Sequence, residues 1–175
     1  MPAWHEDPNL KSKFHADFPD DVQVIVHDGG PRLSSHAPEL MWVRIVEQRR
    51  PGYIGTLLNE PHALTSVRKG DTIVFLATES CEYPFRVTEK YLTEREGWNI
   101  EPCNKCGFDE LFDAPSDLIK KIFPNWPEGD SLLAFTSFCP ICRGVQSIRS
   151  KAASGFHTGD KARKWWQFWK KGNRA

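Results

Sequence analysis

The sequence predicts an α+β protein that is mainly β: a small β-barrel or sandwich-like domain, a module organised by cysteine pairs, and a C-terminal amphipathic helix. Short apolar segments alternate with turn signals at close intervals, as they do in small sandwiches and barrels. The long helical patterns that a doubly wound α/β sheet needs between its strands are not found. Two Cys-x-x-Cys motifs stand in the second half of the chain. We therefore expect a lead-in over residues 1–20, a β-rich domain over 21–98, the cysteine module over 99–149, and a linker with a helix over 150–175.

The lead-in mixes charges, prolines and aromatic residues without a period, so a loosely structured segment is expected there. In the β-rich domain, residues 22–27 alternate in hydrophobicity and then reach the turn signal Asp28-Gly29-Gly30-Pro31, which is typical of a strand and its end. The same signals predict further strands over residues 41–46, 53–58, 72–77 and 83–87. Residues 88–96 fit either a short helix or a strand.

The cysteine motifs, Cys103-Asn-Lys-Cys106 and Cys139-Pro-Ile-Cys142, are separated by 32 residues. A Cys-x-x-Cys pair on a tight turn can bind one metal ion with both thiolates, and a second pair completes a tetrahedron. Glycine follows each pair, at Gly107 and Gly144, where we expect it to accommodate the positive φ of a metal-binding turn. The sequence therefore predicts a zinc ribbon in which one structural zinc ion is bound by Cys103, Cys106, Cys139 and Cys142.

Two other chemistries use the same residues. A thioredoxin-like redox pair would stand at a helix start in a βαβ unit, and that setting is not found in the sequence. The pattern Cys-x-x-Cys-Gly followed by Cys-Pro-x-Cys is also that of rubredoxin, so an iron–tetrathiolate electron carrier stays open beside zinc. Four thiolates leave no open position for water, so catalysis by the metal is not expected.

The segment between the cysteine motifs contains helix signals over about residues 114–123. The run from Asp113 supplies a capping residue, a first-turn proline at Pro115, early acids and late lysines, and Pro124 ends it. Its apolar residues share one face, so we expect the helix to pack over the cysteine module or onto the β-rich domain. Strands are expected to enter and leave the second cysteine turn over residues 132–138 and 145–148.

Residues 150–160 have the composition of a linker, and residues 161–171 follow as a basic, tryptophan-rich amphipathic helix. Its apolar face would need a cover, because three bare tryptophans make a costly exposed patch. That cover is either the β-rich domain itself, a groove of a partner protein, an anionic membrane surface or single-stranded nucleic acid. The expected partner-binding residues are Lys164, Trp165, Trp166, Trp169, Lys170 and Lys171.

The formal net charge of zero conceals an asymmetry between the two ends of the chain. Residues 143–175 hold nine Lys or Arg against one acid, a balance of +8, so residues 1–142 carry −8. A basic tail can fold onto its own acidic body or bind an anionic partner. No apolar run is long enough for a membrane span, the N-terminus has no secretory pattern, and the cysteine usage fits a reducing compartment, so a cytoplasmic protein is expected.

One stretch carries a family resemblance. It consists of Glu39-Leu-Met-Trp-Val-Arg-Ile45, then Gly52-Tyr-Ile-Gly-Thr-Leu-Leu-Asn-Glu-Pro61, then Lys69-Gly-Asp-Thr-Ile-Val-Phe75. Over about residues 38–78 it resembles a YegJ-like bacterial domain of unknown function, which shares the Met-Trp-Val strand and the Gly-Asp turn into an apolar strand. The resemblance implies a bacterial protein, but it implies no activity and no catalytic residue for this chain.

No nucleophile elbow, phosphate-binding glycine loop or His-Glu-x-x-His motif is present in the sequence. We therefore expect a non-enzymatic bacterial zinc-binding protein that acts as a binding or adaptor protein, an immunity or defence role being one version. A nucleic-acid-binding protein that uses the basic C-terminal region is an alternative. A further alternative is an enzyme with a site in the β-rich domain, around His27 beside Asp28 or His36 near Glu39. The leftover Cys81 is expected to be a small, partly buried side chain.

Overall fold

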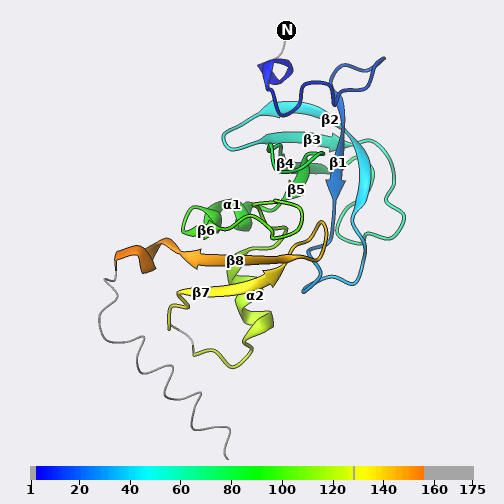
Figure 1. Ribbon diagram of the computed structural model, residues 1–175. Helices are drawn as coiled ribbons and strands as arrows, with labels where there is room; N and C mark the ends of the chain where they lie inside the picture. The colour runs from blue at the N-terminus through cyan, green and yellow to red at the C-terminus, as the bar shows by residue number, and fades with distance from the viewer. Residues whose placement is uncertain (1–2, 128, 156–175) are drawn as a thin grey trace, which may run out of the picture.

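The computed structural model describes residues 3–127 and 129–155, which form a β-barrel and a second, smaller sheet beside it (Figure 1). After a short 3-10 helix, η1 (Ala3–Glu6), the barrel strands follow one another along the chain and close in the order β1-β2-β3-β4-β5. They are β1 (Asp21–Val26), β2 (Glu39–Gln48), β3 (Tyr53–Leu57), β4 (Thr72–Leu76) and β5 (Phe85–Val87). Successive strands pair antiparallel, and a parallel pair between Ile25 and Phe85 closes the barrel.

Alternating burial explains why these segments are strands. In β2, Met41, Val43 and Ile45 point inward while their neighbours are partly or fully exposed, which is the period-two pattern of a half-buried strand. β1 and β3 alternate in the same way, and their inward side chains meet in the barrel interior. The lead-in contributes Leu10 to this core, and Phe14 forms a bridge with Val22. The expectation of a loosely structured lead-in is therefore wrong, because its scattered apolar side chains pack against the barrel core.

The second unit contains two helices and a sheet within the described residues. Its elements are α1 (Glu89–Arg95), β6 (Trp98–Ile100), α2 (Pro115–Ile122), β7 (Ala134–Phe138), β8 (Val145–Ser150) and the 3-10 helix η2 (Lys151–Gly155). The sheet has the order β6-β8-β7, with both neighbouring pairs antiparallel. Residues 88–96 are helical because the Thr88 side chain caps α1 by accepting a hydrogen bond from the Tyr91 N–H at 3.1 Å.

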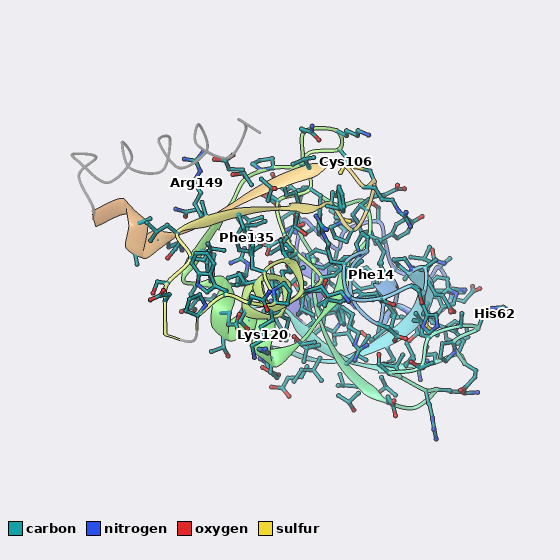
Figure 2. All side chains as sticks on the ribbon, turned by 90° about the horizontal axis from the view of Figure 1, so that it is seen from below. Phe14, His62, Cys106, Lys120, Phe135 and Arg149 are labelled. Carbon is teal, nitrogen blue, oxygen red and sulfur yellow. The ribbon has the colours of Figure 1, made fainter. Side chains whose placement is uncertain are left out.

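Barrel and cysteine module share buried surface. In the described residues, the core of the module contains Phe85 and Val87 of the barrel strand β5 together with Cys103 and Cys139. Side chains occupy the space between the two units without a break, and His62 lies at an edge of the barrel while Phe135 lies within the module (Figure 2). The module is therefore fixed on the barrel through packed side chains.

Two details of the module differ from expectation. The N-cap of α2 is Ala114, whose methyl group offers no acceptor, and the expected cap Asp113 instead accepts a hydrogen bond from the Gly30 N–H at 2.8 Å. Residues 150–155, expected to begin a linker, are instead the end of β8 at Ser150 and the 3-10 helix η2, while the rest of the expected linker lies outside the described residues. The amphipathic helix expected over residues 161–171 lies outside the described residues and stays a prediction.

Candidate metal centre

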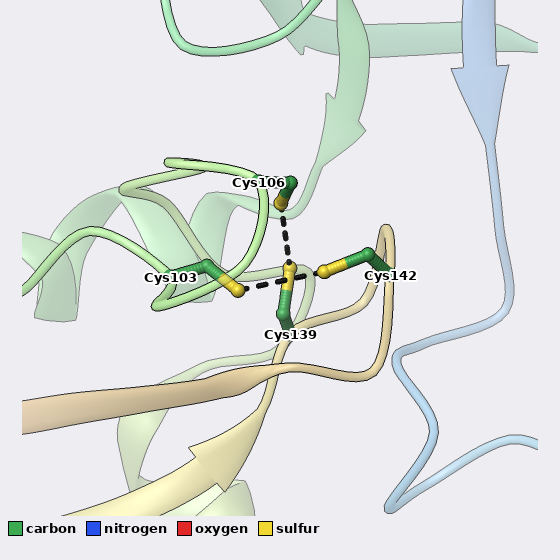
Figure 3. Close-up of side chains that lie close together, drawn as sticks. All are labelled: Cys103, Cys106, Cys139 and Cys142. Atoms are coloured by element: carbon green, nitrogen blue, oxygen red, sulfur yellow. Dashed lines mark hydrogen bonds between the residues drawn. The ribbon is translucent and has the colours of Figure 1, made fainter.

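Four cysteine sulfur atoms gather where the two motifs meet (Figure 3). The Sγ atoms of Cys103, Cys106, Cys139 and Cys142 all lie within 4.8 Å of one another. The Sγ atoms of Cys103 and Cys142 are 3.5 Å apart, and those of Cys106 and Cys139 are 3.6 Å apart. The cluster predicted from the motif spacing is therefore confirmed as a possible metal-binding site.

The separations fit a tetrahedral ion. A tetrahedron with metal–sulfur bonds of about 2.3 Å has sulfur–sulfur edges of about 3.8 Å, close to the observed values. The donor set is chemically uniform, since every ligand is a cysteine sulfur. Cys139 is fully buried and Cys103 is nearly so, whereas Cys106 is exposed, so the site lies at the surface of the module core.

The two cysteine turns have equivalent backbone hydrogen bonds. In each turn the first cysteine's N–H donates five residues ahead, from Cys103 to the Phe108 carbonyl at 2.8 Å and from Cys139 to the Gly144 carbonyl at 2.7 Å. Backbone N–H groups also point at the sulfurs, with Lys105 N at 3.5 Å from Cys103 Sγ and Gly144 N at 3.4 Å from Cys142 Sγ. Such N–H···S contacts orient the thiolates and stabilise their charge.

Asn104 joins the two turns directly. Its N–H donates to the Val145 carbonyl at 3.1 Å, and its side-chain oxygen accepts from the Val145 N–H at 2.9 Å. These bonds continue the pairing of β6 with β8 up to the cysteines and fix the distance between the motifs. Sequence reasoning missed Asn104, because nothing in its local pattern shows which distant strand it pairs with.

The two glycines that follow the cysteine pairs are needed for different reasons. Gly107 does adopt a positive φ of 80°, but the equivalent residue in the second turn is Arg143, with φ 59°. Gly144 is needed for space, because a Cβ built there would lie 2.5 Å from Cys103 Sγ. The expected role is thus confirmed for Gly107 and wrong for Gly144, since the second turn places a non-glycine residue in the left-handed region.

The protonation of the thiols differs around the cluster. Burial opposes ionisation of Cys103, but the backbone N–H groups of Cys106 and Lys105 prevail and lower the pKa of its thiol to about 6. Burial raises the pKa of Cys139 above that of a free thiol. Burial disfavours negative charge on four neighbouring sulfurs. A divalent cation deprotonates the thiols that coordinate it, so a bound metal ion would balance the charge of the four thiolates.

The histidines expected in an alternative enzyme site have structural roles. His27 is buried, and both of its ring nitrogens are used: Nδ1 accepts from the Gly29 N–H at 3.0 Å and Nε2 lies 2.7 Å from the Arg86 carbonyl. Burial lowers the pKa of His27 to about 4, so the ring is neutral with its proton on Nε2. In the other candidate pair of that alternative, His36 does not contact Glu39: it lies 3.0 Å from Asp28, and Glu39 accepts backbone N–H groups of residues 62–64.

The remaining predicted residues lie apart from the sulfur cluster. Cys81 is buried in the module core and is not one of the four clustered cysteines. The expected partner-binding residues Lys164, Trp165, Trp166, Trp169, Lys170 and Lys171 lie outside the described residues. Comparison of the chain with protein-family models, with curated proteins and with solved structures finds no match.

Proposed function

We propose that this chain is a non-enzymatic zinc-binding protein in which one structural zinc ion holds the cysteine module in shape for binding a partner. The observation that carries the proposal is the closed set of four cysteine sulfurs within 4.8 Å of one another. Four thiolate ligands fill the coordination of a tetrahedral zinc ion and leave no position for a reacting water. Zinc is preferred over iron here because cysteine-rich sites that join segments of a fold are typical of structural zinc.

The binding part of the proposal is supported by apolar side chains exposed beside the second cysteine turn. Phe138 and Val145, a cross-strand pair of β7 and β8, are 44% and 45% exposed, and Ile141 in the turn is 40% exposed. Arg32 lies over the Phe138 ring at 4.4 Å, and Arg143, two positions after Ile141 in the chain, is exposed. An apolar patch with basic neighbours suits a protein partner that presents apolar residues flanked by acids.

Nucleic-acid binding has less support in the described part of the chain. Residues 1–155 hold 17 Lys or Arg against 22 Asp or Glu, so this part is acidic overall. The alternative therefore depends on the basic residues after position 155. Salt-dependent retention on single-stranded DNA that is abolished by deleting residues 156–175 would favour it over a protein partner.

Cobalt substitution tests the closed site. Reduced, metal-free protein titrated with Co²⁺ should give the visible absorption of tetrahedral cobalt with sulfur ligands, and the spectrum should not change on adding azide. Cys139→Ser should abolish the four-sulfur spectrum, whereas Cys81→Ala should leave it unchanged. A spectrum that shifts on adding azide would show an open coordination position and would overturn the structural assignment.

A further inference from the structure

A cavity of about 160 Å³ lies where the barrel meets the cysteine module. The cavity is separate from the candidate metal centre, because no cysteine lines it. The barrel contributes the residues that follow β1, the loop between β3 and β4, and strand β5. The module contributes α2 and the segment that leads into it. The lining residues are His27, Asp28, Gly29, Ser66, Arg86, Thr88, Phe112, Asp113, Ala114 and Asp117.

The walls of this junction cavity are preorganised. The rings of His27 and Phe112 stack at 3.8 Å with an interplanar angle of 3°, which joins barrel to module. Asp28 fixes the neighbouring loop, since its carboxylate accepts hydrogen bonds from both the N–H and the hydroxyl of Thr65 and of Ser66. Groups that are already held in place lose little entropy when a ligand binds.

Arg86, on the barrel side of the cavity, has hydrogen-bond donors to spare. Arg86 Nη1 donates to the His27 carbonyl at 2.8 Å and to Ser66 Oγ at 2.6 Å. Within the described residues, Nε and Nη2 of the same guanidinium have no hydrogen-bond partner. Burial lowers the pKa of Arg86, against the opposing effect of the Asp28 and Asp71 charges, so its charge is partly desolvated and its Nε and Nη2 donors would gain from pairing with a ligand oxyanion.

The module side of the cavity carries an incompletely used carboxylate. Asp113 Oδ2 accepts from the Gly30 N–H at 2.8 Å, while Oδ1 has no hydrogen-bond partner within the described residues. Burial, with a smaller contribution from nearby Asp117, raises the pKa of Asp113 to about 6. A Cβ on Gly29 would lie 2.8 Å from Oδ1, so only glycine leaves this oxygen accessible on the loop side.

We propose that the junction cavity binds a small zwitterionic amino acid, with its carboxylate on Arg86 and its ammonium group on Asp113. A ligand with a single charge would satisfy only one of the two desolvated groups. The volume of about 160 Å³ favours a small ligand, because an enclosed cavity of about 150 Å³ holds benzene, with roughly six non-hydrogen atoms; this cavity is also open to solvent on one side. Glycine, alanine, serine and β-alanine are of that size, whereas aromatic amino acids exceed it.

Calorimetric titration of the full, metal-loaded chain tests the proposal. The probes are glycine, L-alanine, L-serine, β-alanine and γ-aminobutyrate, which vary the spacing of the two charges, and acetate and methylammonium, which carry one charge each. At least one amino acid should bind saturably, and more tightly than either single-charge probe. If no amino acid binds saturably, or if acetate binds as tightly as the best amino acid, the proposal is overturned.

Asp113→Asn is the decisive variant. The amide oxygen can still accept from the Gly30 N–H, so the fold is retained while the charge that holds the ammonium group is lost. Loss of a charged hydrogen bond should weaken amino-acid binding by at least about tenfold. Asp109→Asn, which changes an exposed carboxylate outside the cavity, serves as the matched control and should bind like the unchanged chain. Equal affinities for Asp113→Asn and the control would overturn the assignment.

Discussion

A methyl group on Gly144 would lie 2.5 Å from the Cys103 sulfur and 2.8 Å from the side-chain oxygen of Asn104. Neither neighbour can move freely, because the sulfur faces the other cysteines and Asn104 pairs with Val145. Gly107 differs: it has a φ of 80°, but a Cβ there meets nothing within 4 Å. The two glycines therefore separate the effect of crowding the site from the effect of a strained backbone.

Gly144→Ala should weaken metal binding strongly and Gly107→Ala should not. In Gly144→Ala the Cys103 sulfur must shift, and changes next to a metal ligand typically cost about 10–100-fold in affinity. Gly107→Ala should cost about 1 kcal/mol of stability through the left-handed backbone while leaving the sulfurs in place. Competition with a zinc chelator measures both affinities, and equal affinities for the two variants would contradict this reading.

Asp113 predicts a pH-dependent stability difference. Its pKa is raised from 3.8 to about 6, so between about pH 4 and pH 6 the folded state binds more protons than the unfolded state. The stability of the unchanged chain relative to Asp113→Asn should therefore fall as the pH rises through that window. Below about pH 4 the two should be similar, and above about pH 6 the variant should be more stable by about 2–3 kcal/mol.

Urea unfolding at several pH values, without amino-acid ligands, measures this difference. Comparison of two chains that share the cysteine site cancels the pH dependence of metal binding. A stability difference that stays constant from pH 4 to pH 7 would show that Asp113 titrates normally.

Among individual residues, the sequence predicted the four cysteines well but did not predict the residues that line the junction cavity. Cys-x-x-Cys spacing has a geometric meaning that holds in any fold, so all four sulfurs were found. Asp113 and Arg86 were missed as a pair, because they are brought together only when the module packs on the barrel. Asp113 was expected to cap α2, since its position before Pro115 is a local signal that tertiary contact overrides.

Between elements, a buried carboxylate joins α1 to the segment after the first cysteine turn. Glu110 is 2% exposed and accepts hydrogen bonds from the Tyr91 hydroxyl and from the Arg95 guanidinium, whose Nε lies 2.6 Å from Oε2. The Tyr91 hydroxyl also accepts from the Leu111 N–H at 3.0 Å. Strand β4 contributes Leu76 to the same core, so this network lies beside the boundary of barrel and module.

Glu110→Gln should destabilise the fold by about 2–3 kcal/mol, because it leaves the Arg95 charge without its buried partner. The matched control is Glu89→Gln, which removes a carboxylate paired with Arg49 at 2.7 Å but 64% exposed. That pair should contribute less than about 1 kcal/mol. Urea midpoints of the two variants provide the measurement, and equal losses would show that Glu110 is not held by the network.

Most elements could be predicted because their residues repeat with the strand period. The strands β1 to β4 lie within a few residues of their predicted ranges, since the first three alternate in hydrophobicity and β4 is a short apolar run. β6 was missed because Trp98–Ile100 is too short to show a period and exists through its pairing with β8. None of the helices in the described residues is long and apolar enough to cross a bilayer.

Taken as a whole, the described residues bury their apolar side chains in two clusters that depend on the cysteines to different degrees. The barrel cluster contains no cysteine, whereas the module cluster contains Cys103 and Cys139. A structural zinc ion contributes about 10–16 kcal/mol of binding free energy in small zinc-binding folds, as much as the whole stability of a typical domain. Removal of the metal should therefore affect the module far more than the barrel.

Hydrogen exchange with and without a chelator tests this asymmetry. Amides of β6, β7 and β8 should lose most of their protection when the metal is removed, and residues 100–148 should unfold. Amides of β1 to β3 should keep most of theirs, because their core is independent of the cysteines. Equal loss of protection in both units would show that the barrel does not fold without the module.

Elemental analysis of freshly purified, reduced protein tests the zinc assignment most directly. We predict one zinc ion per chain, retained through gel filtration and released when a mercurial reagent blocks the thiols. Cys139→Ser should lose the ion, and Cys81→Ala should keep it. Protein that returns no bound metal, or that contains iron in place of zinc, would contradict the account.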